Sequence, residues 1–299
     1  MPNKKYFKKQ LASIGSQDYK NIELIVYNDF PNGENLEHDI KEIIGDIPFI
    51  YIHGEMNLGY IKAFEKLVGL AHGEYICFCD QDDIWRKDRI SSAVKELDKG
   101  FVLAACDRSI IDEKDNQVIP SWKKANKNAP EMNWKSGDDI TIQACFTCYS
   151  IGMGTIMRTD VAKSLIPFPP SEGHDKWLAA GASEIGKCAF IDEPLVLYRR
   201  HGNNLSGTFD GIDSKKDWYE KRVRASSVFV RYFEKRFPES PHLPEIKKFM
   251  TAREEKDAIC LFRNRKVAPL LAYFEIVLSC IPEPIFKKFV KYYKSTNKI

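Results

Sequence analysis

Three aspartates lie within four positions of the chain, immediately after a short apolar run. Asp80, Asp82 and Asp83 follow residues 75–79, which read YICFC. Removing such a cluster from water without a counter-charge is costly, and a divalent cation would neutralise it. Carboxylate oxygens suit Mg²⁺ or Mn²⁺. A cap on the helix expected from Ile84 needs one carboxylate, a role open to Asp83, so the excess favours Asp82 as a metal ligand.

The elements that must position these aspartates alternate along the first hundred residues. Apolar runs alternate with amphipathic, helix-like stretches, and the runs are Ile22–Tyr27, Pro48–Ile52, Tyr75–Cys79 and Phe101–Cys106. This alternation is typical of βαβ units and predicts an α/β fold with a mainly parallel sheet between helices. Ligands of such sheets bind beyond the carboxyl ends of the strands, which is where the three aspartates are expected.

The segment from Asn57 to Trp85 (NLGYIKAFEKLVGLAHGEYICFCDQDDIW) resembles the centre of family 2 glycosyltransferases, especially the bacterial rhamnosyltransferase-like branch. The resemblance covers roughly residues 5–207 and implies the GT-A fold, which is Rossmann-like. It implies that Asp80 contacts the ribose of a nucleotide sugar. It also implies that Asp82 binds the Mn²⁺ or Mg²⁺ ion that bridges the two phosphates.

Other segments resemble further parts of the same family. YKNIELIVYND ends at Asp29, which the resemblance places at the nucleotide base, and Asn57 matches a loop near the nucleotide, although a turn explains Asn57 equally well. HDKW, residues 174–177, resembles the acidic base motif and implies that Asp175 is the catalytic carboxylate. A carboxylate that merely begins a helix is the alternative for Asp175. An inverting transfer needs one such general base for the acceptor hydroxyl.

A last match, YRRHGNN at residues 198–204, resembles the segment that closes over the diphosphate. It implies that His201 contacts the metal or a phosphate, and that Arg199 or Arg200 pairs with phosphate. One feature departs from the family: its first strand, which lines the base pocket, is not found before the helix expected at Tyr6–Ile14. This departure predicts a short start, a replacement edge or impaired nucleotide binding.

These matches predict a metal-dependent, inverting glycosyltransferase with a nucleotide-sugar donor, most simply a UDP- or dTDP-sugar. The expected acceptor is a glycan or a lipid-linked glycan of bacterial surface polysaccharide or glycoconjugate synthesis. The alternative is a catalytically weak relative that serves as a binding or assembly subunit. A nucleotidyltransferase is less favoured, because no Gly-rich phosphate loop opens the chain.

Charge divides the chain into two parts, for which we predict a catalytic domain at 1–212 and a helical extension at 213–299. The extension holds 20 basic and 11 acidic residues, whereas the preceding part holds 25 and 31. The asymmetry favours a surface-binding tail over a nucleic-acid-binding body. With no signal-like or membrane-spanning segment, we expect a cytoplasmic protein, peripheral at the inner face of the plasma membrane if the tail binds lipid.

The end of the tail carries an amphipathic pattern. In residues 284–294, PIFKKFVKYYK, apolar side chains follow one helical face and four lysines mostly follow the other. Such a helix can lie on an anionic membrane, and the apolar run Ala268–Pro282 would add a second contact. Docking on the protein's own body or in a homo-oligomer is the alternative, and it is the commoner use of an apolar stripe.

Overall fold

The computed structural model describes residues 3–202 and 209–296 of the 299-residue chain. Its strands are β1 (Leu24–Asn28), β2 (Phe49–His53), β3 (Tyr75–Cys77), β4 (Ile84–Trp85), β5 (Leu103–Ile111), β6 (Gln117–Ile119), β7 (Thr155–Arg158) and β8 (Cys188–Arg199). The helices of the sheet region are α1 (Lys4–Gly15), α2 (Glu37–Ile44), α3 (Tyr60–Leu70), α4 (Arg89–Leu97), α5 (Trp122–Ala125), α6 (Thr141–Ala144), α7 (Thr159–Ser164) and α8 (His174–Ile185). Single 3₁₀ turns lie at Pro130–Met132 and Gly152–Gly154.

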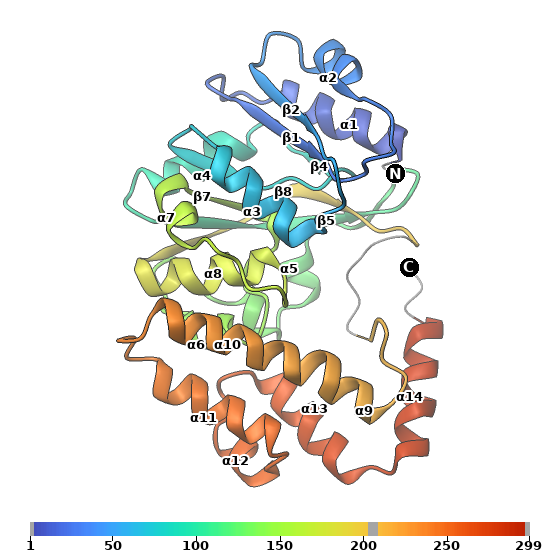
Figure 1. The fold of residues 1–299 in the computed structure, drawn as a ribbon, viewed down its shortest axis with the longest axis vertical. Helices are drawn as coiled ribbons and strands as arrows, with labels where there is room; N and C mark the ends of the chain where they lie inside the picture. Colours follow the sequence, from blue (N-terminus) through green and yellow to red (C-terminus); the bar gives the residue numbers. More distant parts are fainter. Residues whose placement is uncertain (1–2, 203–208, 297–299) are drawn as a thin grey trace.

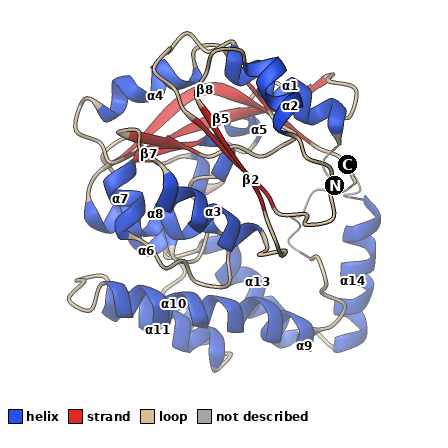
Figure 2. Cartoon of the chain, turned by 45° about the horizontal axis from the view of Figure 1, so that its top comes forward, coloured by secondary structure: helices blue, strands red, loops and turns tan. Residues whose placement is uncertain are grey.

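The remaining helices form the C-terminal part of the molecule. They are α9 (Lys215–Trp218), the π-helical turn Tyr219–Val223, α10 (Arg224–Arg236), α11 (Leu243–Glu254), α12 (Ala258–Arg263), α13 (Pro269–Cys280) and α14 (Glu283–Thr296). In Figure 1, β1, β2, α1 and α2 lie at one end of the molecule and α9 to α14 at the other. Figure 2 shows helices on both sides of the central strands. The α/β class and the C-terminal helices are therefore as the sequence predicts.

Strand direction differs from the expected mainly parallel sheet. Within the described residues, β1–β2 and β5–β8 are parallel, whereas β3–β7, β5–β7, β4–β8 and β5–β6 are antiparallel. The six-stranded sheet runs β3-β7-β5-β8-β4, with β6 paired to β5. The βαβ pattern covers only the first hundred residues, so it could not give the direction of β7, which inserts between β3 and β5.

The two-stranded sheet β1–β2 is separate from the larger sheet. In the part of the chain that the structure describes, no strand pairs with the second edge of β1 or of β3. Glu23 ties the amino ends of these strands together, because its Oε1 accepts hydrogen bonds from the backbone N–H groups of His72 (2.6 Å) and Gly73 (2.9 Å). The strand that the family resemblance places first is thus not found among the described residues, and its effect on donor binding stays a prediction.

Helix α1 holds the β1–β2 layer against the larger sheet. Asn3 caps the helix by accepting a hydrogen bond from the Lys5 backbone N–H at 3.1 Å. Phe7 and Leu11 pack with the core of α2 and β2, while Ile14 packs with the core around Trp85. Apolar residues at this helical spacing give the helix two buried stripes, which explains how one short helix joins two sheets.

The C-terminal helices share a core with the sheet region. Trp177 of α8 is almost fully buried and packs edge-on against Phe229 and Phe233 of α10, with ring centroids 5.5 and 6.5 Å away. Helix α9 begins at Lys215, close to the predicted division at residue 212, and that division stays a prediction. None of the described helices combines the length and apolar character that a membrane span needs.

Candidate active site

The aspartates that follow β3 open onto a broad cleft of about 1920 Å³. Asp80 and Asp82 line this cleft, and so does Asp175 at the start of α8. Burial raises the pKa of Asp80 to about 7, and the carboxylates of Asp82 and Asp175 act in the same direction. The fold therefore brings together three carboxylates from two segments almost a hundred residues apart, in a place where their mutual repulsion favours a bound cation or proton.

Asp82 and His201 lie in direct contact. His201 Nε2 is 2.7 Å from Asp82 Oδ2, and the two side chains are only 18% and 12% exposed for Asp82 and His201, respectively. The imidazole stacks on Tyr6 of α1, with ring centroids 5.6 Å apart and planes inclined by 19°. Both residues expected to bind metal thus meet at one point, although 119 positions separate them.

The side chains of Asp82 and His201 suit a hard divalent ion whose remaining ligands come from the substrate and water. Mg²⁺ is usually held by one or two carboxylates together with waters and substrate phosphates, rather than by a full protein cage. Asp82 and His201 offer a carboxylate and an imidazole, and Mn²⁺ accepts both. Elsewhere among the described residues, His38, Asp39 and Glu42 on α2 form a group with metal-compatible spacing, but His38 and Glu42 are exposed.

Asp83 and Arg199 form a buried contact behind the residues that line the cleft. Asp83 is fully buried and accepts a hydrogen bond from the Arg199 backbone N–H at 2.9 Å, whereas residues 84–85 form β4. The expectation of a helix from Ile84 capped by Asp83 is therefore wrong, because this segment pairs with β8.

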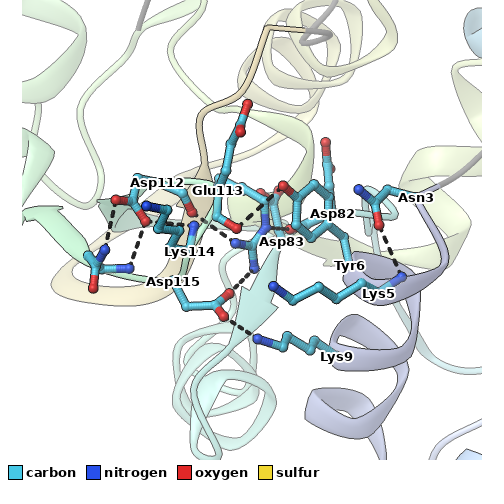
Figure 3. Close-up of polar contacts among 12 residues, drawn as sticks. Asn3, Lys5, Tyr6, Lys9, Asp82, Asp83, Asp112, Glu113, Lys114 and Asp115 are labelled. Carbon is cyan, nitrogen blue, oxygen red and sulfur yellow. Dashed lines mark hydrogen bonds and ion pairs between the residues drawn. The ribbon is translucent and has the colours of Figure 1, made fainter.

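Arg199 itself does not reach the cleft. Its Nε and Nη1 donate to the carbonyls of Asp82 (2.8 Å) and Asp112 (2.9 Å), and its Nη2 pairs with Asp115 Oδ1 at 2.6 Å. Figure 3 shows Tyr6 close to Asp82, Asp112 and Asp115. The Tyr6 ring centroid lies 4.3 Å from the guanidinium carbon of Arg199. The Arg199 side chain is fully buried and its Nε holds the Asp82 carbonyl, so the structure does not bring it to the cleft, and its expected phosphate role stays a prediction. Arg200 lines the cleft, so of the two expected arginines it is the one that can meet a ligand.

Asp29 and Asn57 are brought together at the opposite rim. Asp29 accepts hydrogen bonds from the backbone N–H groups of Leu58 (2.6 Å) and Gly59 (2.8 Å), and Asn57 Nδ2 donates to the Asp29 carbonyl at 2.8 Å. Gly59 has φ +73°, a conformation that favours glycine, immediately before α3 begins. Both expected nucleotide contacts line the cleft, and their mutual bonds shape the loop between β2 and α3.

Asp175 enters the cleft from a strained turn. Glu172 and Gly173, immediately before α8, have φ values of +73° and +84°. The Cys148 thiol donates to Asp175 Oδ2 at 3.5 Å, and burial raises the pKa of that thiol well above its ordinary value. Lys176 turns away from the cleft and pairs with Glu172 at 2.7 Å. Glu172 and Asp175 both line the cleft, so the turn presents two carboxylates to it, and Glu172 is the one that Lys176 pairs with.

Sequence reasoning missed Arg108 and Trp122, which also line the cleft. Arg108 lies in the second half of β5, and Trp122 begins α5. Both fall in residues 107–135, which lack hydrophobic periodicity and resemble an irregular excursion. The available signal was the charged pair Asp107–Arg108 between the apolar run Phe101–Cys106 and the apolar pair Ile110–Ile111, since a charged side chain in a buried strand is uncommon without a partner.

Comparisons with known proteins agree on the family. Residues 3–156, about half of the chain, match the sequence profile described as glycosyl transferase family 2. An uncharacterised glycosyltransferase of Methanocaldococcus jannaschii is 35% identical over 243 residues, covering 75% of this chain and 79% of the relative. One of Haemophilus influenzae is 31% identical over 216 residues, covering 69% and 64%. A dTDP-rhamnosyl transferase, RfbG of Shigella flexneri, is 25% identical and covers 73% and 79%.

Solved structures agree on the fold. S. aureus TarS 1–349 in complex with UDP-GlcNAc has a TM-score of 0.56 at 15% identity, covering 90% of this chain and 79% of that one. The mannosyltransferase PcManGT from Pyrobaculum calidifontis, in complex with GDP-Man and Mn²⁺, has a TM-score of 0.52 at 16% identity and covers 96% and 81%. Both share the GT-A arrangement. On the profile match and the two relatives above 30% identity, this chain belongs to glycosyl transferase family 2.

Proposed function

We propose that the protein is a metal-dependent, inverting glycosyltransferase that moves a sugar from a nucleotide-sugar donor to a glycan or lipid-linked glycan. The observation that carries this proposal is the meeting of Asp80, the Asp82–His201 pair and Asp175 on one cleft. The chain spans about 64% of the Haemophilus relative and 79% of the Methanocaldococcus relative, both of which are named as glycosyltransferases.

The proposed chemistry assigns one task to each side chain. Asp175 accepts the proton of the acceptor hydroxyl as that oxygen attacks the anomeric carbon, opposite the departing diphosphate. Asp80 orients the donor through its ribose. Asp82 and His201 would hold Mn²⁺ or Mg²⁺, which would stabilise the negative charge of the leaving diphosphate. Inversion needs Asp175 alone as the base, because no second carboxylate acts as a nucleophile, and the neighbouring Glu172 is paired with Lys176.

The donor class follows from the relatives and structural neighbours. Their names and titles mention dTDP-rhamnose transfer, UDP-GlcNAc and GDP-Man, and we propose UDP- or dTDP-sugars for this chain. Calorimetric titration of UDP, GDP and dTDP, each with Mn²⁺, Mg²⁺ or EDTA, tests the proposal. We expect one nucleotide to bind only when metal is present. Equal binding in EDTA would remove metal from the account, and binding of none would favour the weak-relative alternative.

Separation of the β1–β2 layer from the larger sheet favours that alternative, a catalytically weak relative acting as a binding or assembly subunit. Among the described residues, the free edges of β1 and β3 stay unpaired beside the cleft. A donor site whose wall is incomplete would bind nucleotide weakly. This alternative would be favoured if a nucleoside diphosphate binds in the presence of metal but the protein does not turn over the corresponding nucleotide sugar.

We also propose that the protein binds peripherally to membranes through its C-terminal helices. Helix α14 docks Phe286, Val290 and Tyr293 on the body, so part of the predicted stripe packs on the protein itself. Other apolar side chains of α12, α13 and α14 remain exposed: Ile259, Phe262, Leu270, Tyr273, Val277, Ile285, Phe289 and Tyr292. Lys287, Lys288 and Lys291 lie beside them on α14, and a surface of this kind suits anionic lipid.

Vesicle co-sedimentation tests the membrane proposal. We expect binding to anionic vesicles at low salt, weakened by salt and by the double substitution Leu270→Ser and Val277→Ser. The matched control is Val118→Ser, because Val118 is 52% exposed on β6, far along the chain from this surface. Concentration-dependent association in solution, without binding to vesicles, would assign the surface to a homo-oligomer instead.

A further inference from the structure

The end of β8 presents its side chains alternately to two different places. Arg199 and His201 both contact the ring of Tyr6. Tyr198 and Arg200 instead meet Trp122 and Arg108 on the other side. Successive side chains of an extended strand point to opposite faces, which explains the division. Arg200 is therefore separated by the strand itself from the Asp82–His201 pair.

Arg108 and Arg200 share two aromatic rings. Their guanidinium carbons lie 5.1 and 5.6 Å from the centroid of the Trp122 ring, and 6.0 and 5.9 Å from that of Tyr198. Rings at this range stabilise a cation modestly. Burial lowers the pKa of Arg108, and the positive charge of Arg200 acts in the same direction. Two guanidiniums are thus held close together against their mutual repulsion.

No described carboxylate neutralises this pair. Within the residues that the structure describes, neither Arg108 nor Arg200 has an acidic side chain within 4.0 Å of its nitrogens, and the buried Nε of Arg108 has no hydrogen-bond partner. Asp107 is adjacent in sequence, but its two oxygens accept hydrogen bonds from Ser121 Oγ (2.5 Å) and the Lys123 backbone N–H (2.9 Å). Asp107 still stabilises the charge of Arg108 electrostatically, but one carboxylate cannot offset two guanidiniums, and it forms no ion pair with either.

The pair lies on the Asp175 side of the cleft. Cys148 connects the two, because its thiol donates to Asp175 and also lies within electrostatic range of Arg108. Arg108, Trp122, Cys148, Arg200 and Asp175 all line the same cleft. A negatively charged group bound by the two arginines would place its neighbouring atoms toward the proposed base rather than toward the proposed metal.

We propose that Arg108 and Arg200 bind a phosphate group of the acceptor substrate, with Trp122 packing against the sugar that carries it. This inference rests on the proposed function and deepens it by naming the acceptor class, a phosphate-linked sugar. Guanidinium groups match phosphate oxygens with paired, charge-assisted hydrogen bonds. An aromatic ring beside them offers the flat apolar surface that a sugar ring covers.

Binding of a small phosphate probe tests the inference without turnover. The probe is N-acetylglucosamine 1-phosphate, titrated calorimetrically in EDTA, and the uncharged comparison is the methyl glycoside of the same sugar. We expect wild type to bind the phosphate better than the glycoside. Arg200→Gln and Arg108→Gln should each weaken phosphate binding about tenfold or more, the loss of a hydrogen bond to a charged group. Arg200→Lys should recover part of the loss, because charge remains without the planar fork.

Further measurements show whether a loss of probe binding is specific to the two arginines and to the acceptor phosphate. Lys124→Gln, an exposed cation on the same short helix as Trp122, should bind the probe as wild type does. Because the inference assigns Arg200 to the acceptor in place of the donor diphosphate that the family resemblance implies, nucleoside diphosphate with Mn²⁺ should bind all of these variants equally. Sedimentation with phosphatidylglycerol vesicles should not change.

Several results would overturn the inference: no preference of wild type for the phosphate, unchanged probe binding in Arg200→Gln, or loss of nucleotide binding together with probe binding. A change in vesicle binding alone would assign the arginines to lipid headgroups, which also overturns it. If wild type binds no nucleotide in the presence of metal, that separate result contradicts the proposed function. Arg108→Gln counts only if its thermal melt matches wild type, and Arg200→Gln keeps the test decisive if it does not.

Discussion

The cleft and the C-terminal helices leave different kinds of group without partners. In the cleft these groups are polar: Asp80 lies among other carboxylates, and Arg108 forms no ion pair with a carboxylate of the described residues. In the C-terminal helices the buried charges are paired, and the groups left exposed are apolar, such as Leu270 and Tyr292. The difference favours a charged ligand for the first region and, as proposed above, an apolar surface for the second.

Pairing within the C-terminal region is tight around one ion pair. Arg253 of α11 and Glu275 of α13 are each 2% exposed, and Arg253 Nη2 lies 2.9 Å from Glu275 Oε1. Trp218 Nε1 donates to the same carboxylate at 3.0 Å. A buried pair of this kind is weak support for net stability, but removing one partner leaves an uncompensated buried charge.

The largest effect we predict is therefore on folding. Glu275→Ala should lower the free energy of unfolding by about 3–5 kcal/mol, because Arg253 then stays buried without its counter-charge. Urea denaturation of wild type and variant measures the change. The matched control is Glu220→Ala, which removes an exposed pair with Lys216 and should change stability by about 1 kcal/mol or less. Equal losses in both variants would show that the two charge pairs are not different in kind.

A comparable effect is predicted for ligand binding in the cleft. Asp82→Ala should weaken metal-dependent binding of nucleoside diphosphate at least about 100-fold, because even the loss of a partner outside the ligand shell costs ten- to 100-fold. Calorimetry with Mn²⁺ measures it, and Asp46→Ala removes an exposed aspartate as the control. Unchanged affinity of Asp82→Ala for nucleoside diphosphate with Mn²⁺ would contradict the assignment of Asp82 as a metal ligand.

Asp175→Asn should separate turnover from binding. We predict that turnover falls about 100-fold or more while donor affinity stays near that of wild type, since only proton removal in the transition state is lost. Asp160→Asn is the matched control, because Asp160 also begins a helix but is exposed. Steady-state kinetics beside thermal melts measures both properties. Normal turnover with weakened donor binding would move Asp175 out of the base role.

The smallest predicted effect concerns His242, which joins the C-terminal helices to the sheet region. Its ring nitrogens lie 2.8 Å from Glu184 of α8 and 2.8 Å from Asp139. Burial alone would lower the pKa of His242, but these hydrogen bonds outweigh it and raise the pKa above 6.5. The stabilisation is therefore complete below pH 6.5, and it is lost as the pH rises through the folded-state pKa.

His242→Gln should remove that pH dependence. We predict that wild type loses about 1 kcal/mol or less between pH 6 and pH 8 relative to the variant, because Asp139 is largely exposed and solvent screens the pair. Chemical denaturation at both pH values measures the difference, with His72→Gln as an exposed comparison. If the free energy of unfolding changes equally with pH in wild type and variant, the protonation of His242 does not contribute to stability.

The sequence predicts the carboxylate half of the cleft well. Asp80 and Asp82 follow an apolar strand at a sheet edge, and Asp175 begins a helix, so both places could be read from local pattern. The contact of Asp82 with His201 needed the family resemblance, because 119 residues separate them and local periodicity carries no such information.

The arginine half of the cleft shows why prediction fails elsewhere. Arg199 and Arg200 are neighbours of one type, and alternation says only that they face opposite sides. Which of the two arginines reaches the cleft depends on the pairing of β8 with β5 and on the position of α1, which are tertiary properties. Arg108 was hidden for a related reason: β5 continues through Ile111 into a segment that lacks hydrophobic periodicity.

The most direct test of the central claim is release of nucleoside diphosphate from UDP-, GDP- and dTDP-sugars by wild-type protein, with Mn²⁺ or Mg²⁺ and again in EDTA. We predict release from at least one donor when metal is present, loss of that release in EDTA, and its loss in Asp82→Ala. Release that continues unchanged in EDTA, or metal-dependent nucleotide binding with no release from the matching sugar donors, would contradict the account of this protein as a metal-dependent glycosyltransferase.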